Sequence, residues 1–182
     1  MVMMHAIGIN DSEGRDRSDM VCVEPFPDED LRKVVGITLV DSMAQTVPDA
    51  VFDQLDSGDL LFVDSTHVVK TGSELTRIYL EVLPNLKPGV MVHIHDIYLP
   101  FNFAPDILGN LYDWQETTLV AALLTGNPHL KVLASMSALH HTRSRELNAI
   151  FSQYRPHVMP SGLFVGDVEA SYFPSSLWLT TQ

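Results

Sequence analysis

Short, uninterrupted apolar runs recur along the chain and alternate with segments of helical periodicity. Five of these runs occupy residues 20–24, 36–40, 59–64, 90–95 and 130–135. Continuous apolar runs are typical of strands in a parallel sheet that is covered on both faces. The chain is therefore expected to be an α/β protein with a doubly wound, mostly parallel sheet and helices on both faces.

Apolar residues at spacings of three and four predict helices between the runs. Residues 73–86 carry such a stripe, and Thr71 and Glu74 before it have the spacing of a capping box. Residues 114–125 show a similar pattern, with Asp113 and Glu116 at the expected helix start.

Two further elements complete the expected fold. A helix over residues 142–154 is expected to place four side chains on its inner face: Leu147, Ile150, Phe151 and Tyr154. Residues 175–181, SSLWLTT, predict a final strand that is antiparallel to the others. The polar stretch of residues 10–19 predicts an exposed loop.

Composition narrows the classes of partner. The chain has 182 residues and a net charge of −12, and its 11 basic residues are scattered. Nucleic acids and anionic membranes are therefore not expected as partners, because both attract clustered Lys and Arg. There is no apolar run of about 18 residues to span a membrane, and Cys22 has no second cysteine to pair with. These features predict a soluble, cytoplasmic protein.

Two expected strands end on Asp and His side chains. Asp64 ends one strand, and His95 and Asp96 end the next. In open α/β sheets, ligands bind beyond the carboxyl ends of the strands, so these three side chains are expected at one rim. Carboxylates favour Mg²⁺ or Mn²⁺, and a histidine moves the preference toward Mn²⁺, Fe²⁺ or Zn²⁺. Asp64, His95 and Asp96 are therefore predicted to bind one divalent metal ion.

His67 lies three residues after Asp64 and is a candidate general base beside that ion, because imidazole titrates near neutral pH. Each residue alone has a simpler explanation. Asp64 could cap a turn, His93 could pack within the sheet, and His140 and His141 could form the exposed start of the last helix. The coincidence of metal-binding residue types at two strand ends favours the metal site.

Four segments, in this order and spacing, resemble class I S-adenosylmethionine-dependent methyltransferases: CVEPFP, GDLLFVDSTHVVKTGSE, LPNLKPGVMVHIHDIYLPF and WQETTLVAALLTGN. The branch that they resemble is small-molecule O-methyltransferase-like, related to metal-dependent sugar O-methyltransferases and cephalosporin-hydroxylase-like proteins. The resemblance implies a single methyltransferase-like domain over residues 1–182 with a Rossmann-like sheet. Residues 20–182 would supply strands two to seven, and residues 1–19 the remnant of the first helix and a polar loop.

The resemblance also implies roles for individual residues. The reaction would be methyl transfer from S-adenosylmethionine to a hydroxyl of a small molecule. Glu24 matches the acidic residue that binds the ribose hydroxyls, and Asp64 is the second candidate for cofactor binding. Asp64, His95 and Asp96 match the metal-binding acids of the relatives, except that His95 stands in place of a carboxylate. His67 matches the proposed base of a DxxH arrangement.

The glycine-rich turn that receives the methionine part of the cofactor in this family is missing, since Gly8 and Gly14 do not form it. The sheet is therefore expected to be N-terminally incomplete and S-adenosylmethionine to bind weakly. Three explanations stay open: a misassigned or truncated start, a substitute strand from residues 2–9, or a partner chain that fills the gap, as in a homodimer.

Two alternative functions also stay open. The chain could be a non-catalytic binding or assembly module that keeps the methyltransferase fold. It could also carry out metal-dependent chemistry other than methyl transfer at the Asp64, His95 and Asp96 rim. The loop of residues 97–113 is aromatic and contains proline, so it is expected to cover the site as a substrate lid.

Overall fold

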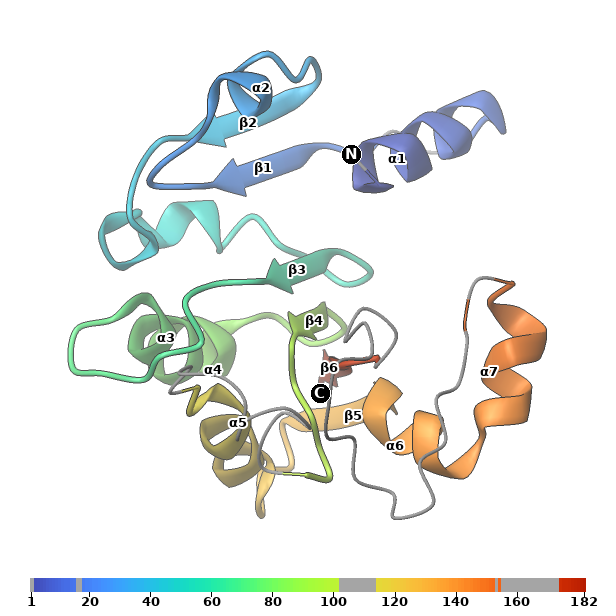
Figure 1. Cartoon of the computed structure of the whole chain (residues 1–182). Helices are drawn as coiled ribbons and strands as arrows, with labels where there is room; N and C mark the ends of the chain where they lie inside the picture. Colours follow the sequence, from blue (N-terminus) through green and yellow to red (C-terminus); the bar gives the residue numbers. More distant parts are fainter. Residues whose placement is uncertain (1, 16–17, 102–113, 153, 155–173) are drawn as a thin grey trace. The chain divides into compact units, whose positions relative to one another are not determined.

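The computed structural model describes residues 2–15, 18–101, 114–152, 154 and 174–182 (Figure 1). The chain divides into two compact units, Met1–Val47 and Pro48–Gln182.

The first unit contains a helix and a pair of parallel strands. Its described elements follow in the order α1 (Val2–Ser12), β1 (Met20–Val23), α2 (Glu29–Arg32) and β2 (Ile37–Val40). Met20 pairs with Ile37, and Val23 with Val40. Both strands lie where the apolar runs predict them.

Of the three explanations left open for the missing glycine-rich turn, the substitute strand from residues 2–9 is wrong, because these residues belong to α1. Methionine and alanine are good helix formers, and the run has none of the alternation of a half-buried strand. The helix continues into the stretch predicted as loop and ends where Gly14 adopts a φ of 70°. Glycine takes this left-handed conformation without steric cost and is common just after helix ends.

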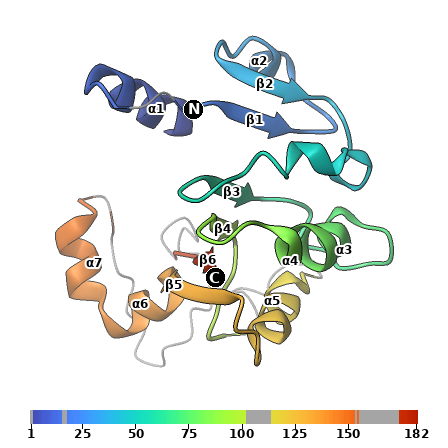
Figure 2. The ribbon, with the colours of Figure 1, turned by 180° about the vertical axis from the view of Figure 1, so that it is seen from behind.

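The second unit is built on a four-stranded sheet of order β3-β4-β6-β5 (Figures 1 and 2). The strands are β3 (Leu60–Val63), β4 (Met91–His95), β5 (Leu130–Ser135) and β6 (Ser176–Thr181). β3 and β4 are parallel, and β6 is antiparallel to β4 and β5 between which it lies. The predicted α/β fold and the antiparallel final strand are confirmed.

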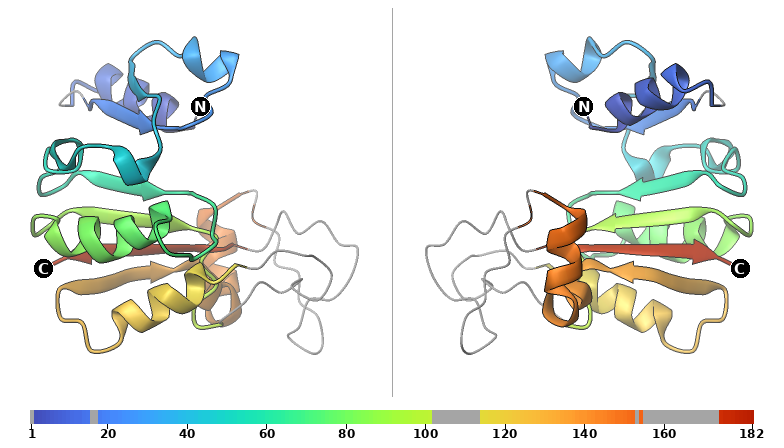
Figure 3. Two further views of the ribbon diagram at one scale, coloured as in Figure 1. Left: turned by 90° about the vertical axis from the view of Figure 1, so that its left-hand side faces the viewer. Right: turned by 90° about the vertical axis from the view of Figure 1, so that its right-hand side faces the viewer.

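Helices lie on both faces of this sheet. Figure 3 shows α3 to α5 in front of the strands in its left view, and α6 and α7 in front in its right view. The elements are α3 (Glu74–Arg77), the π-helical turn η3 (Ile78–Val82), α4 (Leu83–Asn85), α5 (Glu116–Leu124), α6 (Met136–Thr142) and α7 (Ser144–Ile150). Two short 3₁₀ turns are also present: η1 (Ala44–Thr46) follows β2 in the first unit, and η2 (Asp49–Val51) precedes β3 in the second.

The core lies between the sheet and α3 to α5. Alternate residues of β4 and β6 are buried, so Ile94 and Leu179 face the helices while His93 and His95 lie on the other face of the sheet. The central core residues are all nearly or fully buried: Val63, Leu75, Tyr79, Leu83, Val92, Ile94, Val120, Leu177 and Leu179. This packing fixes the direction of the two strand ends that carry the candidate site.

Several local predictions differ from the structure. Ser73, not Thr71, caps α3, since its hydroxyl accepts the N–H of Thr76. Leu147 is buried in α7 as expected, but Ile150 and Phe151 are exposed. The helix predicted over residues 142–154 corresponds to α7, but α6 was not predicted.

His140 and His141 lie in the last turn of α6 and not at the start of the following helix. Residues 102–113 of the predicted substrate lid lie outside the described residues. In the part of the chain that the structure describes, no helix has the length and apolar character needed to cross a membrane.

Replacing Leu75 with alanine should destabilise the fold strongly, because this side chain is 0% exposed in the centre of the core. A buried leucine replaced by alanine costs about 2–5 kcal/mol of unfolding free energy. Leu80 lies in the same helical segment and is 61% exposed, so Leu80→Ala is the matched control and should change stability by less than about 0.5 kcal/mol. Chemical denaturation of both variants measures the difference. Equal losses would contradict the assigned core.

Candidate functional site

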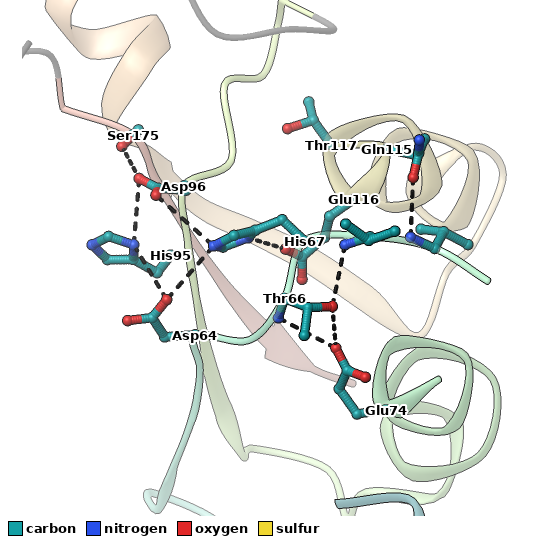
Figure 4. A network of polar contacts seen from close by, with 12 residues as sticks. Asp64, Thr66, His67, Glu74, His95, Asp96, Gln115, Glu116, Thr117 and Ser175 are labelled. Carbon is teal, nitrogen blue, oxygen red and sulfur yellow. Dashed lines mark hydrogen bonds and ion pairs between the residues drawn. The ribbon is translucent and has the colours of Figure 1, made fainter. Parts of the chain in front are cut away.

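Asp64, His95 and Asp96 meet at one edge of the sheet. β3 ends at Val63 and β4 at His95, and the two strands are parallel neighbours, so their carboxyl ends lie side by side. Nδ1 of His95 lies 3.7 Å from Oδ1 of Asp64 and 3.3 Å from Oδ1 of Asp96. Figure 4 shows the three side chains facing one another. The sequence-based expectation that they share a rim is confirmed.

His67 enters the same group from the loop after β3. Its Nε2 lies 3.7 Å from Oδ1 of Asp64 and 3.9 Å from Oδ2 of Asp96 (Figure 4). The imidazole is buried. The structure thus brings together all four of the residues that the sequence places at this rim.

The backbone is unusual at two of these residues. His67 has a φ of 60° and Asp96 a φ of 51°, a region that residues other than glycine seldom adopt. Each is held by neighbours: the His67 carbonyl accepts N–H groups of Gln115 and Glu116, and the Asp96 carboxylate accepts the Ser175 hydroxyl at 2.6 Å. Such conformations concentrate at functional sites, where the surrounding structure maintains them.

Glu116 is a site residue that the sequence analysis missed. Its carboxylate is 1% exposed, and Oε2 lies 2.6 Å from Nδ1 of His67. The hydroxyl of Tyr79 donates a hydrogen bond to Oε1. Glu116 was interpreted only as a residue of the helix start. The sequence feature that could have identified Glu116 is its spacing of four from Val120, which places its carboxylate on the buried face of α5.

The loop that carries His67 is fastened on both sides of that residue. Before it, the backbone N–H and the hydroxyl of Thr66 donate to Oε1 of Glu74. After it, the N–H of Val69 donates to Oε1 of Gln115 at 3.1 Å. These contacts come from α3 and from the residue before α5, so both helices position the loop.

The charges around His67 raise its pKa. Burial of the imidazole lowers the pKa, but the hydrogen bond to Glu116 and the negative charges of Glu116, Asp96 and Asp64 outweigh burial. Burial, together with the charge of Glu116, raises the pKa of Tyr79 well above its ordinary value. Tyr79 therefore stays protonated and acts as a donor.

His93 behaves differently from its neighbours. Its ring stacks on Trp178, with ring centroids 4.0 Å apart and an angle of 15° between the planes. Burial and the nearby His95 lower the pKa of His93. His93 therefore packs against an aromatic side chain of the sheet, which is the simpler of the interpretations that its sequence position allowed.

The side chains at the rim are of the types that bind divalent cations. Two carboxylates are present. Nδ1 of His95 is buried and, although it lies 3.3 Å from Oδ1 of Asp96, it makes no hydrogen bond of suitable geometry among the described residues. However, within the described ranges no cluster of three or more His, Cys, Asp or Glu side chains has a geometry able to hold a metal ion. The metal site at Asp64, His95 and Asp96 stays a prediction.

Glu24 directly follows β1 in the first unit. Its backbone N–H bonds to the Val40 carbonyl at 3.1 Å, and its Oε1 accepts the N–H of Phe26 at 2.9 Å. The predicted ribose-binding carboxylate thus follows a strand end, as the resemblance implies.

Comparison with known families identifies the chain. The sequence model of the family described as methyltransferase domain matches residues 2–97, which is more than half of the 182 residues. The chain belongs to the methyltransferase domain family. Methyltransferase domains in general use S-adenosylmethionine as the methyl donor. The match includes Glu24 and the four rim residues of this methyltransferase domain but not Glu116. No curated protein and no solved structure matches the chain.

His67 and His93 of this methyltransferase domain should titrate on opposite sides of the ordinary histidine pKa of 6.5, His67 above it and His93 below it. Because the folded pKa of His67 is raised, its ionised form stabilises the fold fully below pH 6.5, and this stabilisation is lost as pH rises through the folded pKa. NMR titration of the imidazole signals measures both midpoints, and His67→Gln and His93→Gln variants assign them. A His67 midpoint below that of His93 would contradict the assigned electrostatics.

Proposed function

We propose that this chain transfers the methyl group of S-adenosylmethionine to a hydroxyl of a small molecule, with His67 as the general base. The observation that carries the proposal is the position of His67. Its Nδ1 is bound to the buried Glu116, and its Nε2 is directed toward the carboxylates of Asp64 and Asp96 at the strand ends. The family supports methyl transfer, and the resemblance to O-methyltransferases supports a hydroxyl acceptor.

The chemistry follows from the imidazole. When bound, S-adenosylmethionine supplies a methyl group activated by a sulfonium. Nε2 of neutral His67 accepts the proton of the substrate hydroxyl while the oxygen attacks the methyl carbon. A C–O bond forms, the C–S bond breaks, and the products are the methyl ether, S-adenosylhomocysteine and protonated His67. Proton transfer by a positioned side chain contributes about 10²–10⁴-fold to a rate.

Asp64 and Asp96 have a supporting role in this proposal. Their carboxylates lie 3.7 and 3.9 Å from Nε2, where positive charge appears when His67 takes the proton. Opposite charges at this distance favour the charged imidazolium. Since His67 must be neutral at the start, turnover is expected to increase with pH across its raised pKa.

Glu24 and Asp64 are the residues proposed to bind the cofactor. A carboxylate at a strand end can accept the hydrogen bonds of ribose hydroxyls, which is the role proposed for Glu24. The proposed partner is a small hydroxylated molecule. A cytoplasmic location and a homodimer remain predictions from the sequence.

A second candidate function is a non-catalytic binding or assembly module. The observation that favours it is the placement of the described glycines of the first unit: Gly8 lies within α1, Gly14 at its end, and Gly36 directly before β2. None of these three lies in a turn from a strand to a helix, where phosphate- and cofactor-binding glycines occur in nucleotide-binding folds. The two functions differ in whether methyl transfer occurs.

Methyl transfer is tested with the full chain, saturating S-adenosylmethionine and a panel of sugars, catechols and other small hydroxylated molecules. Mass spectrometry measures S-adenosylhomocysteine and the methylated product. His67→Gln should lower turnover on the order of 10²-fold or more, because it removes the base. His129→Gln, at an exposed histidine of the same unit, is the matched control and should retain turnover. No transfer to any acceptor would support the binding module, and unchanged turnover in His67→Gln would exclude His67 as the base.

The predicted metal ion has its own test. If Asp64, His95 and Asp96 bind a divalent ion, protein purified without chelator and supplied with Mg²⁺, Mn²⁺, Fe²⁺ or Zn²⁺ should retain about one equivalent. Asp64→Asn and Asp96→Asn should lose it, because each removes a charged oxygen ligand. Asp30→Asn is the control, since Asp30 has a side chain that is 96% exposed. Metal analysis that finds the same content in wild type and both site variants would refute the prediction.

A further inference from the structure

Four contacts from residues 114–116, where α5 begins, converge on His67. Its carbonyl oxygen accepts the N–H of Gln115 at 3.1 Å and that of Glu116 at 3.3 Å. Its ring packs beside Trp114, with centroids 4.5 Å apart. Its Nδ1 lies 2.6 Å from Oε2 of Glu116. Both the backbone and the ring of His67 are thus placed by one short segment.

Hydrogen-bond chemistry determines which ring nitrogen carries the proton. Oε1 of Glu116 accepts the hydroxyl of Tyr79, so the carboxylate already has one donor. An ionised carboxylate has no hydrogen to give, so the contact from Oε2 to Nδ1 requires a proton on Nδ1. In the neutral imidazole, the lone pair is then on Nε2, which is directed toward Asp64 and Asp96.

Burial keeps water from replacing the hydrogen bonds of Glu116. Glu116 is 1% exposed and Tyr79 is 0% exposed, so neither has water as a ready alternative partner. An ionised carboxylate in such a place needs hydrogen-bond donors to compensate for its lost hydration. Tyr79 and His67 both donate to Glu116, and the donor that reaches the rim is His67.

We propose that Glu116 is the positioning residue of this site: it keeps the proton of neutral His67 on Nδ1 and leaves Nε2 free to accept a proton at the rim. The inference deepens the proposed function and rests on it for its catalytic meaning. Tyr79 is the structural support of Glu116, since it occupies the other carboxylate oxygen.

The protonated nitrogen can be observed directly. In protein labelled with ¹⁵N at histidine, NMR at about pH 9, above the ordinary histidine range, should show neutral wild-type His67 with its proton on Nδ1. In Glu116→Gln the hydroxyl of Tyr79 still donates to the oxygen at Oε1, so the amide N–H group faces Nδ1 and donates to it, and the proton should move to Nε2. The signals of His67 are assigned from their loss in His67→Gln. Turnover in the methyl-transfer assay should fall on the order of 10²-fold or more, with KM nearly unchanged.

Two further variants separate positioning from general damage. Glu74→Gln disturbs the same loop through Thr66 without contact to His67, so the proton should stay on Nδ1. Tyr79→Phe removes the second donor of Glu116 but leaves the acceptor, and the proton should again stay on Nδ1.

The outcomes are distinguishable from those of the proposed function. If wild type transfers no methyl group but the proton moves from Nδ1 to Nε2 in Glu116→Gln, the positioning role stands and the proposed reaction fails. Neutral wild-type His67 with its proton on Nε2 would overturn the inference, even if Glu116→Gln does not fold. A folded Glu116→Gln variant that keeps the proton on Nδ1 would overturn it as well.

Discussion

The buried hydrogen bonds of Glu116 connect the core of the second unit to its candidate site. Tyr79 comes from η3, Glu116 from α5 and His67 from the loop after β3. A carboxylate that is almost fully buried would be very unfavourable alone, and the two donors compensate for its lost hydration. The same contacts that satisfy this charge therefore fix the ring of His67. The core therefore sets the ring orientation of His67 at the rim, because its partner Glu116 is buried and cannot turn toward solvent.

The rim gathers negative charge around one imidazole. Glu116 binds one nitrogen of His67, and Asp64 and Asp96 lie near the other. His67 and Asp96 also have left-handed backbone conformations, which cost on the order of 1–3 kcal/mol each and persist only where neighbouring contacts compensate for that cost. Hydrogen bonds from α5 and from Ser175 supply those contacts. A strained backbone and concentrated charge at the same place are typical of sites that act on a ligand.

The sequence predicted the strands to within one residue at each end, since an apolar run reports burial directly. It also placed Asp64, His95 and Asp96 at one rim, because strand direction follows from the α/β pattern. Glu116 could not be found this way. Its partners Tyr79 and His67 are 37 and 49 residues away, and only the packing of α5 brings them together. The resemblance placed the remnant of a first helix in residues 1–19, and α1 lies there. The exposure of Ile150 was missed, because a short apolar stretch fits more than one arrangement until its neighbours are known.

The proposed role of His67 as base and the predicted role of Asp64 and Asp96 as metal ligands are physically coupled at this rim. The nearby carboxylates raise the pKa of His67, which makes it a stronger base but also keeps it protonated to a higher pH. A bound cation would neutralise Asp64 and Asp96 and thereby lower that pKa, so that more His67 would be neutral near pH 7. A positively charged group of the substrate, or the sulfonium of the cofactor, would also lower the pKa of His67 if it came close to these carboxylates. Because Glu116 binds the opposite nitrogen, such a change would alter how readily Nε2 accepts a proton without turning the ring.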